Sequence, residues 1–377
     1  EGGDLPSTTG LSDISKFVAN LHSGLKLVSE IAPKGAFLVG AGGVRRYLVL
    51  GQSADEIRAT GGFVSSAWIV TFENGRLADV RYKDTVAVDD WDRLDLYPKA
   101  PPGLDEHMNA WVWLFRDVSW DPDFPTTART AEDIYRLDQR LDVDGVVAIN
   151  QWTLLRLIDA LGNISSPGGE PVTSRNLLAV LERGTDEHGR AYMDLVVQGL
   201  LDRLSEPMTM PTLIRMASGL SDTLQSRDML LFFDDVDLQA VAGEAGWDGR
   251  IRQVAADYLY VVDSNVGWSK ADRNIERKVE YQVDLRKGSG ATAKLTLGYN
   301  NHSGPGAPGC EPQWLNRGTD YSQLKNACYW NLWRVYIPQG ARLLGNTPLT
   351  LPVDSVSAEI GRGRPGEDTV SVSSSYN

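Results

Sequence analysis

Apolar and polar residues follow two different patterns along the chain, and the change between them lies near Ser264. Upstream, short apolar runs that suit buried strands alternate with segments whose apolar residues recur at helical spacing. We expect strands at 47–50, 63–72, 77–82, 146–149, 229–233 and 258–262, and helices from Ser12 to Pro33 and at 103–115, 125–141, 152–161 and most of 174–226. Strands alternating with helices predict an α/β domain with a central sheet.

The turn Glu73-Asn74-Gly75 separates two of these apolar runs. Asn-Gly between apolar runs is the strongest short signal for a β-hairpin, because both residues accept the left-handed backbone of a tight turn. The sequence therefore predicts that 63–72 and 77–82 are antiparallel neighbours. Charged residues that flank this hairpin would then lie at strand ends, which would bring Arg58 and Asp84 together.

Downstream of Ser264 apolar and polar residues alternate, and no convincing helical pattern remains. Strands are expected at 278–285, 293–299, 329–337 and 355–360, with Gly and Pro turns between them. This predicts a smaller antiparallel β domain of sandwich type. The predicted organisation is a flexible lead-in over 1–10, an α/β domain over 11–264 and a β-rich domain over 265–377. From the abrupt end we expect the chain to be a fragment of something longer.

The chain has 377 residues, a net charge of −13 and no block of Lys or Arg. Nucleic acid is excluded as a partner, because phosphate binding needs a concentrated basic face. The 11 Trp and 13 Tyr would suit carbohydrate, whose apolar faces stack on aromatic rings, although most such rings belong to protein cores. No transmembrane segment or signal peptide is visible, and the chain begins without a Met. We expect that an export signal or membrane anchor has been removed.

Cys310 and Cys328, the two cysteines, flank a polar, turn-rich stretch. This pattern predicts one disulfide and an oxidising compartment, and two unrelated free thiols are the alternative. The four histidines lie far apart, and neither HExxH nor CxxC occurs. A zinc site or a Cys–His nucleophile is therefore not expected, and any chemistry would rest on Arg, Lys, Asp and Glu.

The first charged cluster, Asp-Glu-Ile-Arg at 55–58, follows a buried strand and precedes two glycines. Charges at a strand end beside a flexible turn are where α/β proteins have their ligand sites. The alternative is a solvated turn in which Arg58 pairs with Asp55 or Glu56. A second cluster, Lys83-Asp84-Thr85, stands at the end of the predicted hairpin.

The third cluster, residues 116–123, holds three carboxylates at Asp117, Asp121 and Asp123. Carboxylates at this density suit a hard cation such as Mg²⁺, which prefers oxygen ligands. The EF-hand pattern is not met, since that loop needs Gly at its sixth position and Glu at its twelfth. The alternative is that Asp121 or Asp123 caps the helix that begins near Pro125.

Five arginines are candidates for gripping a pyrophosphate group, because a guanidinium donates two parallel hydrogen bonds to phosphate oxygens. They are Arg58, Arg116, Arg129, Arg183 and Arg190. The alternative is that they are scattered surface residues. Neither a Walker motif nor GxGxxG accompanies them, so a nucleotide site of common type is not expected.

Six motifs follow one another along the chain: DEIRATGGF, FENG, RYKDT, FRDVSWDPDFPTTAR, DGVVAINQWTLLRLIDALGNI and VDSNVGWSKADRNIERKVEYQVDL. In this order, over roughly residues 45–285, they resemble the bacterial domain of unknown function 4012. That family is in turn distantly similar to the LytR-CpsA-Psr enzymes. These are membrane-anchored, extracytoplasmic phosphotransferases that move glycopolymers from a polyprenyl-pyrophosphate carrier to the cell wall with a divalent cation.

The resemblance implies a LytR-CpsA-Psr-like central sheet flanked by helices, a location at the cell surface or in the secreted fraction, and Mg²⁺ as the cation. It implies that Asp84 holds the cation and that Arg58, Arg183 and Arg190 grip pyrophosphate. Together with the charged clusters, it gives candidate catalytic residues Arg58, Lys83, Asp84, Arg116 and Asp117, substrate-binding residues Arg129, Arg183 and Arg190, and metal ligands Asp84, Asp117 and Asp121.

Three departures from the enzyme pattern leave two functions open. Lys83 and Thr60 stand where the enzymes keep Arg and Asp, and Met193-Asp194 replaces an Arg-Gln pair. Lysine lacks the bidentate grip of arginine, and the other losses weaken metal and phosphate binding. The preferred hypothesis is an Mg-dependent phosphotransferase for a polyprenyl-pyrophosphate-linked glycan or cell-wall polymer. The other is a non-catalytic surface scaffold or adhesive protein that self-assembles through exposed β edges.

Overall fold

The computed structural model describes residues 34–165, 169–189, 192–252, 254, 257–286, 290–303, 320–338, 340–345, 356–362 and 368–376. The predicted lead-in and the helix expected from Ser12 lie outside these residues. The described chain groups into two compact units. The first holds the described residues up to Ser53 with Ala59–Pro101 and Trp111–Arg252, and the second holds Ala54–Arg58, Pro102–Ala110 and the described residues beyond Arg252. The sequence predicted a single division, between 264 and 265.

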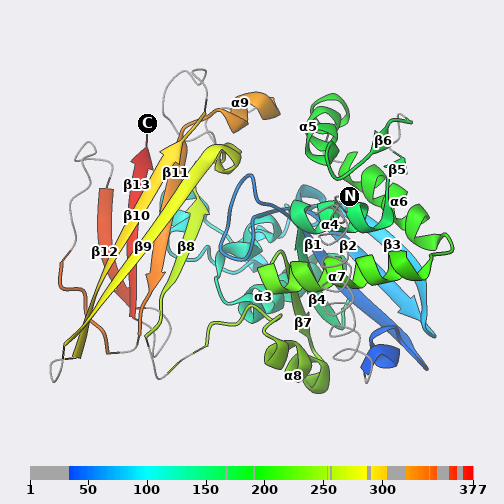
Figure 1. Ribbon diagram of the computed structural model, residues 1–377, viewed down its shortest axis with the longest axis horizontal. Helices are drawn as coiled ribbons and strands as arrows, with labels where there is room; N and C mark the ends of the chain where they lie inside the picture. The colour runs from blue at the N-terminus through cyan, green and yellow to red at the C-terminus, as the bar shows by residue number, and fades with distance from the viewer. Residues whose placement is uncertain are drawn as a thin grey trace, which may run out of the picture. The chain divides into compact units, whose positions relative to one another are not determined.

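A five-stranded mixed sheet lies at the centre of the first unit, in the order β3-β2-β1-β4-β7 (Figure 1). Its strands are β1 (Val44–Ser53), β2 (Phe63–Glu73), β3 (Arg76–Asp84), β4 (Gly145–Asn150) and β7 (Met229–Phe233). β1 and β4 pair in parallel, and the other neighbours pair antiparallel. The carboxyl ends of β1, β3 and β4 therefore lie at the same edge of the sheet.

The predicted hairpin is confirmed by β2 and β3. Asn74 and Gly75 join the two strands with φ angles of 50° and 84°, the left-handed backbone that this turn requires. Across the pair, the rings of Trp68 and Tyr82 lie 5.6 Å apart between centroids. The hairpin carries Lys83 and Asp84 to the sheet edge at which β1 and β4 end.

Helices flank this sheet, as the alternating pattern predicted, and the fold class is confirmed. They are α3 (Phe124–Gln139), α4 (Gln151–Leu161), α5 (Leu177–His188), α6 (Tyr192–Ser205), α7 (Met210–Ser226) and α8 (Val236–Ala245), and the short strands β5 (Ile164–Ser165) and β6 (Pro171–Val172) pair beside them. The main core joins α3 to the strands, and a second core joins α4, α5 and α6. None of the helices in the described ranges combines the length and hydropathy that crossing a bilayer requires.

The β1–β2 pairing leaves no room for a side chain at Gly51. A Cβ atom there would lie 2.3 Å from Ser66 Oγ and 2.6 Å from the Trp68 ring. We expect Gly51→Ala to lower the free energy of unfolding by about 1–3 kcal/mol, because a packed sheet must shift to admit the methyl group. Denaturant unfolding measures this, with Gly43→Ala as the control, since nothing lies within 4 Å of a Cβ at Gly43. Equal stability of the two variants would contradict the expectation.

The second unit is rich in antiparallel β structure, as predicted. Its four-stranded sheet has the order β12-β13-β11-β8, and a separate two-stranded sheet pairs β10 with β9 (Figure 1). The strands are β8 (Tyr260–Asn265), β9 (Ile275–Arg286), β10 (Gly290–Asn301), β11 (Tyr329–Tyr336), β12 (Val356–Arg362) and β13 (Asp368–Tyr376), and the short helices are α2 (Leu104–Met108), η4 (Ala271–Asn274) and α9 (Tyr321–Lys325). Tyr299 of β10 stacks on Trp333 of β11 at 5.3 Å.

One predicted strand belongs to the other sheet, and one predicted helix is shorter than expected. The strand expected at 258–262 was assigned to the α/β sheet, but β8 pairs with β11 of the antiparallel sheet. A short apolar run looks alike in either kind of sheet, so periodicity could not decide. The helix expected over 103–115 is the five-residue α2, because Asn109 takes a left-handed φ of 53° and ends it.

Candidate functional site

The end of β3 continues into the 3-10 turn η1 (Thr85–Ala87) and carries the predicted pair Lys83 and Asp84. Asp84 is the N-cap of η1, and its carboxylate accepts the Val86 N–H at 2.8 Å. Lys83 Nζ donates to Gln139 Oε1 on the last turn of α3. The strand end is therefore tied both to the turn that follows it and to a helix of the same unit.

Residues 85–97, here called the η1–η2 loop, include η1 and a second 3-10 turn, η2 (Leu94–Leu96). Two further hydrogen bonds hold this loop on the end of α3. Gln139 Nε2 donates to Val88 O at 2.8 Å, and Arg93 Nη1 donates to Leu137 O at 3.3 Å. Gln139 thus contacts Lys83 and the loop at the same time.

Tyr97 connects the same loop to a partly buried carboxylate. Its hydroxyl donates to Asp138 on α3 and accepts the Asp90 N–H at 2.8 Å. Burial raises the pKa of Asp138, and the Tyr97 hydrogen bond opposes that shift. Burial and the same hydrogen bond raise the pKa of Tyr97. The phenol therefore keeps its proton and serves as a donor.

Asp89 is the most deeply buried carboxyl group of the loop, with 6% of its surface exposed. Its Oδ1 accepts the Phe115 N–H at 2.9 Å, while its buried Oδ2 has no hydrogen-bond partner among the described residues. Burial raises the pKa of Asp89 to about 7; the Phe115 hydrogen bond and Arg116 oppose the rise, and Asp138 and Asp117 add to it. Such a perturbed carboxyl group marks a candidate functional site.

The 3-10 segment η3 (Phe115–Trp120) supplies Arg116 and Asp117. Arg116 Nε lies 3.3 Å from Asp117 Oδ2, with side-chain exposures of 21% and 5%. Ser119 Oγ donates to Gly62 O at 2.7 Å and so fixes η3 beside the start of β2. The charges of Arg116 and Asp117 both affect the pKa of Asp89, so η3 and the η1–η2 loop form one site. We call Lys83, Asp84, Asp89, Arg116, Asp117 and Asp138 the β3-end site.

The raised pKa of Asp89 predicts how stability depends on pH. The folded protein holds this proton up to about pH 7, whereas the unfolded carboxyl releases it near the ordinary value of 3.8. The stabilising contribution is therefore complete below pH 3.8 and is lost as the pH rises to about 7. We expect wild type to lose on the order of 2 kcal/mol relative to Asp89→Asn between pH 5 and 8.

Denaturant unfolding of both proteins at the two pH values checks this. The comparison cancels Glu132, whose pKa burial also raises, to about 8, since Glu132 is present in both proteins. Parallel pH dependence in wild type and Asp89→Asn would contradict the prediction.

Four of the five predicted catalytic residues lie in the β3-end site, and Arg58 does not. Arg58 belongs to the second unit, where its buried Nη2 lies 2.9 Å from Glu56 Oε1 and its Nη1 donates to Asn265 O. Lys270 Nζ lies 2.7 Å from the other Glu56 oxygen. Burial alone would raise the pKa of Glu56, but Lys270 and Arg58 outweigh it and lower the pKa. The local pairing of Arg58 with Glu56 is confirmed, in a buried turn and not a solvated one.

The predicted substrate-binding arginines have separate partners. Arg129 of α3 lies over the Phe232 ring, with its Cζ 5.2 Å from the centroid. Arg183 of α5 pairs with Glu170, and both side chains are about half exposed. Arg190 lies outside the described residues. A pyrophosphate grip by these arginines stays a prediction from the resemblance.

The predicted metal ligands also have other contacts. Asp84 caps η1, Asp117 pairs with Arg116, and Asp121 Oδ1 accepts the Asp123 N–H at 2.9 Å. Within the described ranges, no group of three or more His, Cys, Asp or Glu residues is arranged to hold a metal ion. These carboxylates do not fit a site built by the protein alone, so no step is derived through Mg²⁺, which stays a prediction.

The position of Asp123 is the one expected if this residue caps the helix that begins near Pro125. It is the N-cap of α3, with Pro125 in the first turn. Its carboxylate accepts the Thr126 hydroxyl at 2.8 Å and the Ile251 N–H at 3.0 Å, and no cap hydrogen bond from a helix amide. Asp123 therefore begins the helix and ties it to the segment that follows α8.

Of the two cysteines in the predicted disulfide, the described residues include only Cys328. Cys310 lies outside the described residues, and the described part contains no free cysteine. The Cys310–Cys328 bridge therefore stays a prediction, which a mass shift on reduction and alkylation would test.

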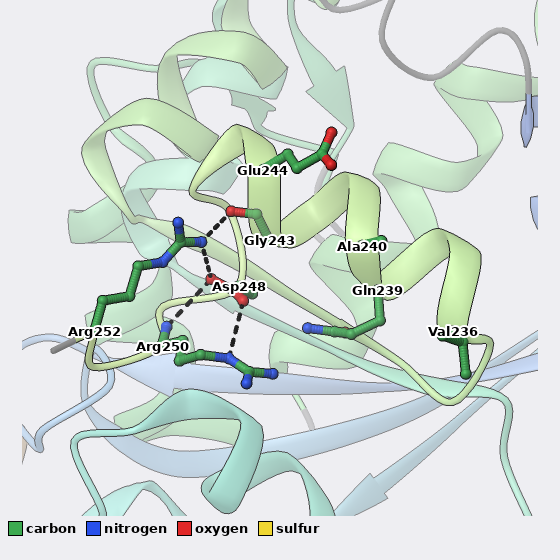
Figure 2. Close-up of a pocket in the computed structure, with 8 residues that line it drawn as sticks. All are labelled: Val236, Gln239, Ala240, Gly243, Glu244, Asp248, Arg250 and Arg252. Carbon is green, nitrogen blue, oxygen red and sulfur yellow. Dashed lines mark hydrogen bonds and ion pairs between the residues drawn. The ribbon is translucent and has the colours of Figure 1, made fainter.

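A pocket of about 430 Å³ opens beside α8, and it contains none of the predicted site residues. Figure 2 shows its lining, which is Val236, Gln239, Ala240, Gly243, Glu244, Asp248, Arg250 and Arg252. Arg250 and Arg252 turn toward Asp248, a carboxylate with 2% exposure, and each lies 3.4 Å from one of its oxygens (Figure 2). Because Asp248 already neutralises part of this charge, the pocket suits a pyrophosphate anion less well than its two arginines suggest.

A model of the family described as "Protein of unknown function (DUF4012)" matches residues 42–185. The predicted resemblance is confirmed over this span, which contains the whole β3-end site. The solved structure of the transcriptional regulator yvhJ from Bacillus subtilis aligns with TM-score 0.30 and 11% identity, over 58% of this chain and 85% of that one. B. subtilis TagV aligns with TM-score 0.32 and 13% identity, over 58% and 87%. These values are low, so the fold class rests on the sheet topology of this chain. No curated protein matches.

Asp89, Tyr97 and Asp138 were not predicted from the sequence. They stand in stretches without a motif, and their burial comes from contacts between the η1–η2 loop, η3 and α3. The available signal was the Asp89-Asp90 pair directly after the apolar Val88. That pattern is equally typical of an exposed turn.

Proposed function

We propose that this chain acts outside the cytoplasm, in the cell envelope, and binds a polyprenyl-pyrophosphate-linked glycopolymer at the β3-end site. The observation that carries the proposal is the buried carboxyl group of Asp89, whose pKa responds to Arg116 and which lies in a loop that Gln139 connects to Lys83 at the end of β3. Ligands of open α/β sheets bind outside the carboxyl ends of strands. The family match supports the proposal, because most of the motifs that carried the resemblance to pyrophosphate-handling enzymes lie within that span.

The residues of the site have complementary roles toward such an anion. Arg116 offers two parallel donors to phosphate oxygens, and Lys83 offers a compact charge. Asp89, neutral below about pH 7, adds no negative charge near the ligand at mildly acidic pH. An anion that binds beside Asp89 favours its protonated form. Pyrophosphate should therefore bind more tightly below pH 7 than above it.

Isothermal titration with farnesyl pyrophosphate, a short prenyl pyrophosphate, tests the proposal. We expect it to bind more tightly than either inorganic pyrophosphate or farnesol, and more tightly at pH 6 than at pH 8. Failure to bind, or an affinity no greater than that of farnesol, would contradict it. Transfer of the glycopolymer is a separate prediction, tested by release of the prenyl product from a lipid-linked glycan.

A second function, the non-catalytic scaffold, is favoured by one feature of the β9–β10 hairpin. Val279, Val283 and Leu285 share a face of β9 and are 53%, 43% and 80% exposed. Their cross-strand partners on β10 are also apolar: Leu297, Ala293 and Ala291. An exposed apolar sheet face suits association with a second copy. Light scattering of wild type and Leu285→Lys tests this; a wild type that stays monomeric at high concentration would exclude it.

A further inference from the structure

The η1–η2 loop presents an exposed tryptophan in a fixed orientation, close in sequence to the buried carboxyl groups. Trp91 is 48% exposed, and its indole N–H donates to Val86 O at 3.0 Å. Val86 itself is 40% exposed. The indole is therefore held by its polar edge while much of its apolar surface faces solvent.

Hydrogen bonds fix the backbone on both sides of Trp91 in the sequence. Val86, which accepts the indole N–H, donates its own N–H to Asp84 at 2.8 Å, so the end of β3 fixes the carbonyl. After the tryptophan, the Arg93 N–H donates to Asp90 O at 3.0 Å, and the Asp90 N–H donates to Tyr97 at 2.8 Å. A ring held in this way loses little conformational freedom when a ligand covers it.

Both residues next to Trp91 in the sequence, Asp90 and Asp92, carry carboxylates. Asp90 is partly buried and accepts the Asp92 N–H at 3.2 Å, and Asp92 is exposed. A sugar residue presents an apolar face of C–H groups and a rim of hydroxyl donors, which matches an indole with acidic acceptors beside it. The core of a protein interface is instead depleted in Asp, so a protein partner fits these surroundings less well.

We infer that Trp91 is a stacking platform for one sugar residue of a glycan, with Asp90 and Asp92 accepting hydrogen bonds from its hydroxyl groups. This inference rests on the proposed function, since the sugar would belong to the chain whose pyrophosphate binds the β3-end site. Asp84 is then a positioning residue, because its carboxylate holds the backbone that carries the indole. The stacking contact itself needs no pyrophosphate and is measurable alone.

The test uses neutral soluble hexasaccharides of three backbone types: chitohexaose, cellohexaose and maltohexaose. Titration of the full chain is expected to show binding of at least one of them. Trp91→Ala should weaken that binding about tenfold or more, and Trp91→Phe should retain most of it. Trp111→Ala is the control, because Trp111 is 66% exposed in the same unit, and its affinity should be unchanged.

The outcomes separate the platform from the pyrophosphate site. Trp91→Ala that binds farnesyl pyrophosphate as wild type does, but has lost the hexasaccharide, supports the inference and shows that the variant is folded. A wild type that binds none of the three sugars overturns it and favours a protein contact at Trp91. Equal losses in Trp91→Ala and Trp111→Ala also overturn it. Sugar binding without farnesyl pyrophosphate binding would contradict the proposed function alone.

Discussion

Replacing Arg58 by alanine is expected to lower the free energy of unfolding of the second unit by about 3–5 kcal/mol. The Arg58 side chain is fully buried, pairs with Glu56 at 2.9 Å and donates to Asn265 O. Its removal leaves a buried carboxylate with one cation, Lys270, and a buried carbonyl without its donor. The loss of one partner from a buried pair costs more than the pair itself contributes, because the remaining charge stays desolvated.

Guanidinium unfolding followed by tryptophan fluorescence measures this loss. Arg183→Ala is the matched control, since its pair with Glu170 has side chains about half exposed and should contribute less than about 1 kcal/mol. If Arg58→Ala is as stable as wild type and has instead lost affinity for farnesyl pyrophosphate, Arg58 is a ligand-binding residue, and its assignment to the buried pair is wrong.

Replacing Arg116 by glutamine is expected to weaken farnesyl pyrophosphate binding about tenfold to a hundredfold. A hydrogen bond to a charged group contributes about 1.5–3 kcal/mol, and glutamine keeps polar donors but loses the charge. The substitution also leaves Asp117, at 3.3 Å from Arg116 Nε, without this cation beside the incoming anion. Arg116→Lys should recover only part of the affinity, because lysine cannot donate two parallel hydrogen bonds.

Titration calorimetry of the three proteins checks this expectation. Arg156→Gln serves as the control, since Arg156 lies on α4 in an exposed pair with Asp222. We expect its affinity to equal that of wild type. Equal losses in Arg116→Gln and Arg156→Gln would show that net charge, and not the β3-end site, determines binding.

Local patterns were sufficient for much of the fold. The Asn74-Gly75 turn specifies its hairpin because its backbone requirement is met by two adjacent residues. The apolar runs became the strands of the central sheet because short buried strands carry their signal within a few residues. The end of α2 at Asn109 depends on a single backbone angle, and the partner of β8 depends on pairing with a strand that is remote in the sequence. No local pattern contains either.

The sequence was sufficient to select most of the charged residues of the candidate site, but not to predict their burial or their contacts. Lys83, Asp84, Arg116 and Asp117 were selected because charges at strand ends are typical of ligand sites. The pKa of Asp89 is raised by burial, and then by Asp138 of α3 and Asp117 of η3, elements that are distant from it in the sequence. The burial of Arg58 depends on Asn265, which follows it by 207 residues. Such tertiary contacts change a predicted ligand residue into a structural one.

Hydrogen–deuterium exchange with and without farnesyl pyrophosphate tests most directly whether the β3-end site binds the lipid pyrophosphate. We predict slower amide exchange on ligand addition in 83–97, in η3 and in the last turn of α3, with 236–252 unchanged. Protection confined to 236–252, which lines the pocket of Figure 2, or no protection at all under saturating ligand, would contradict the proposed site.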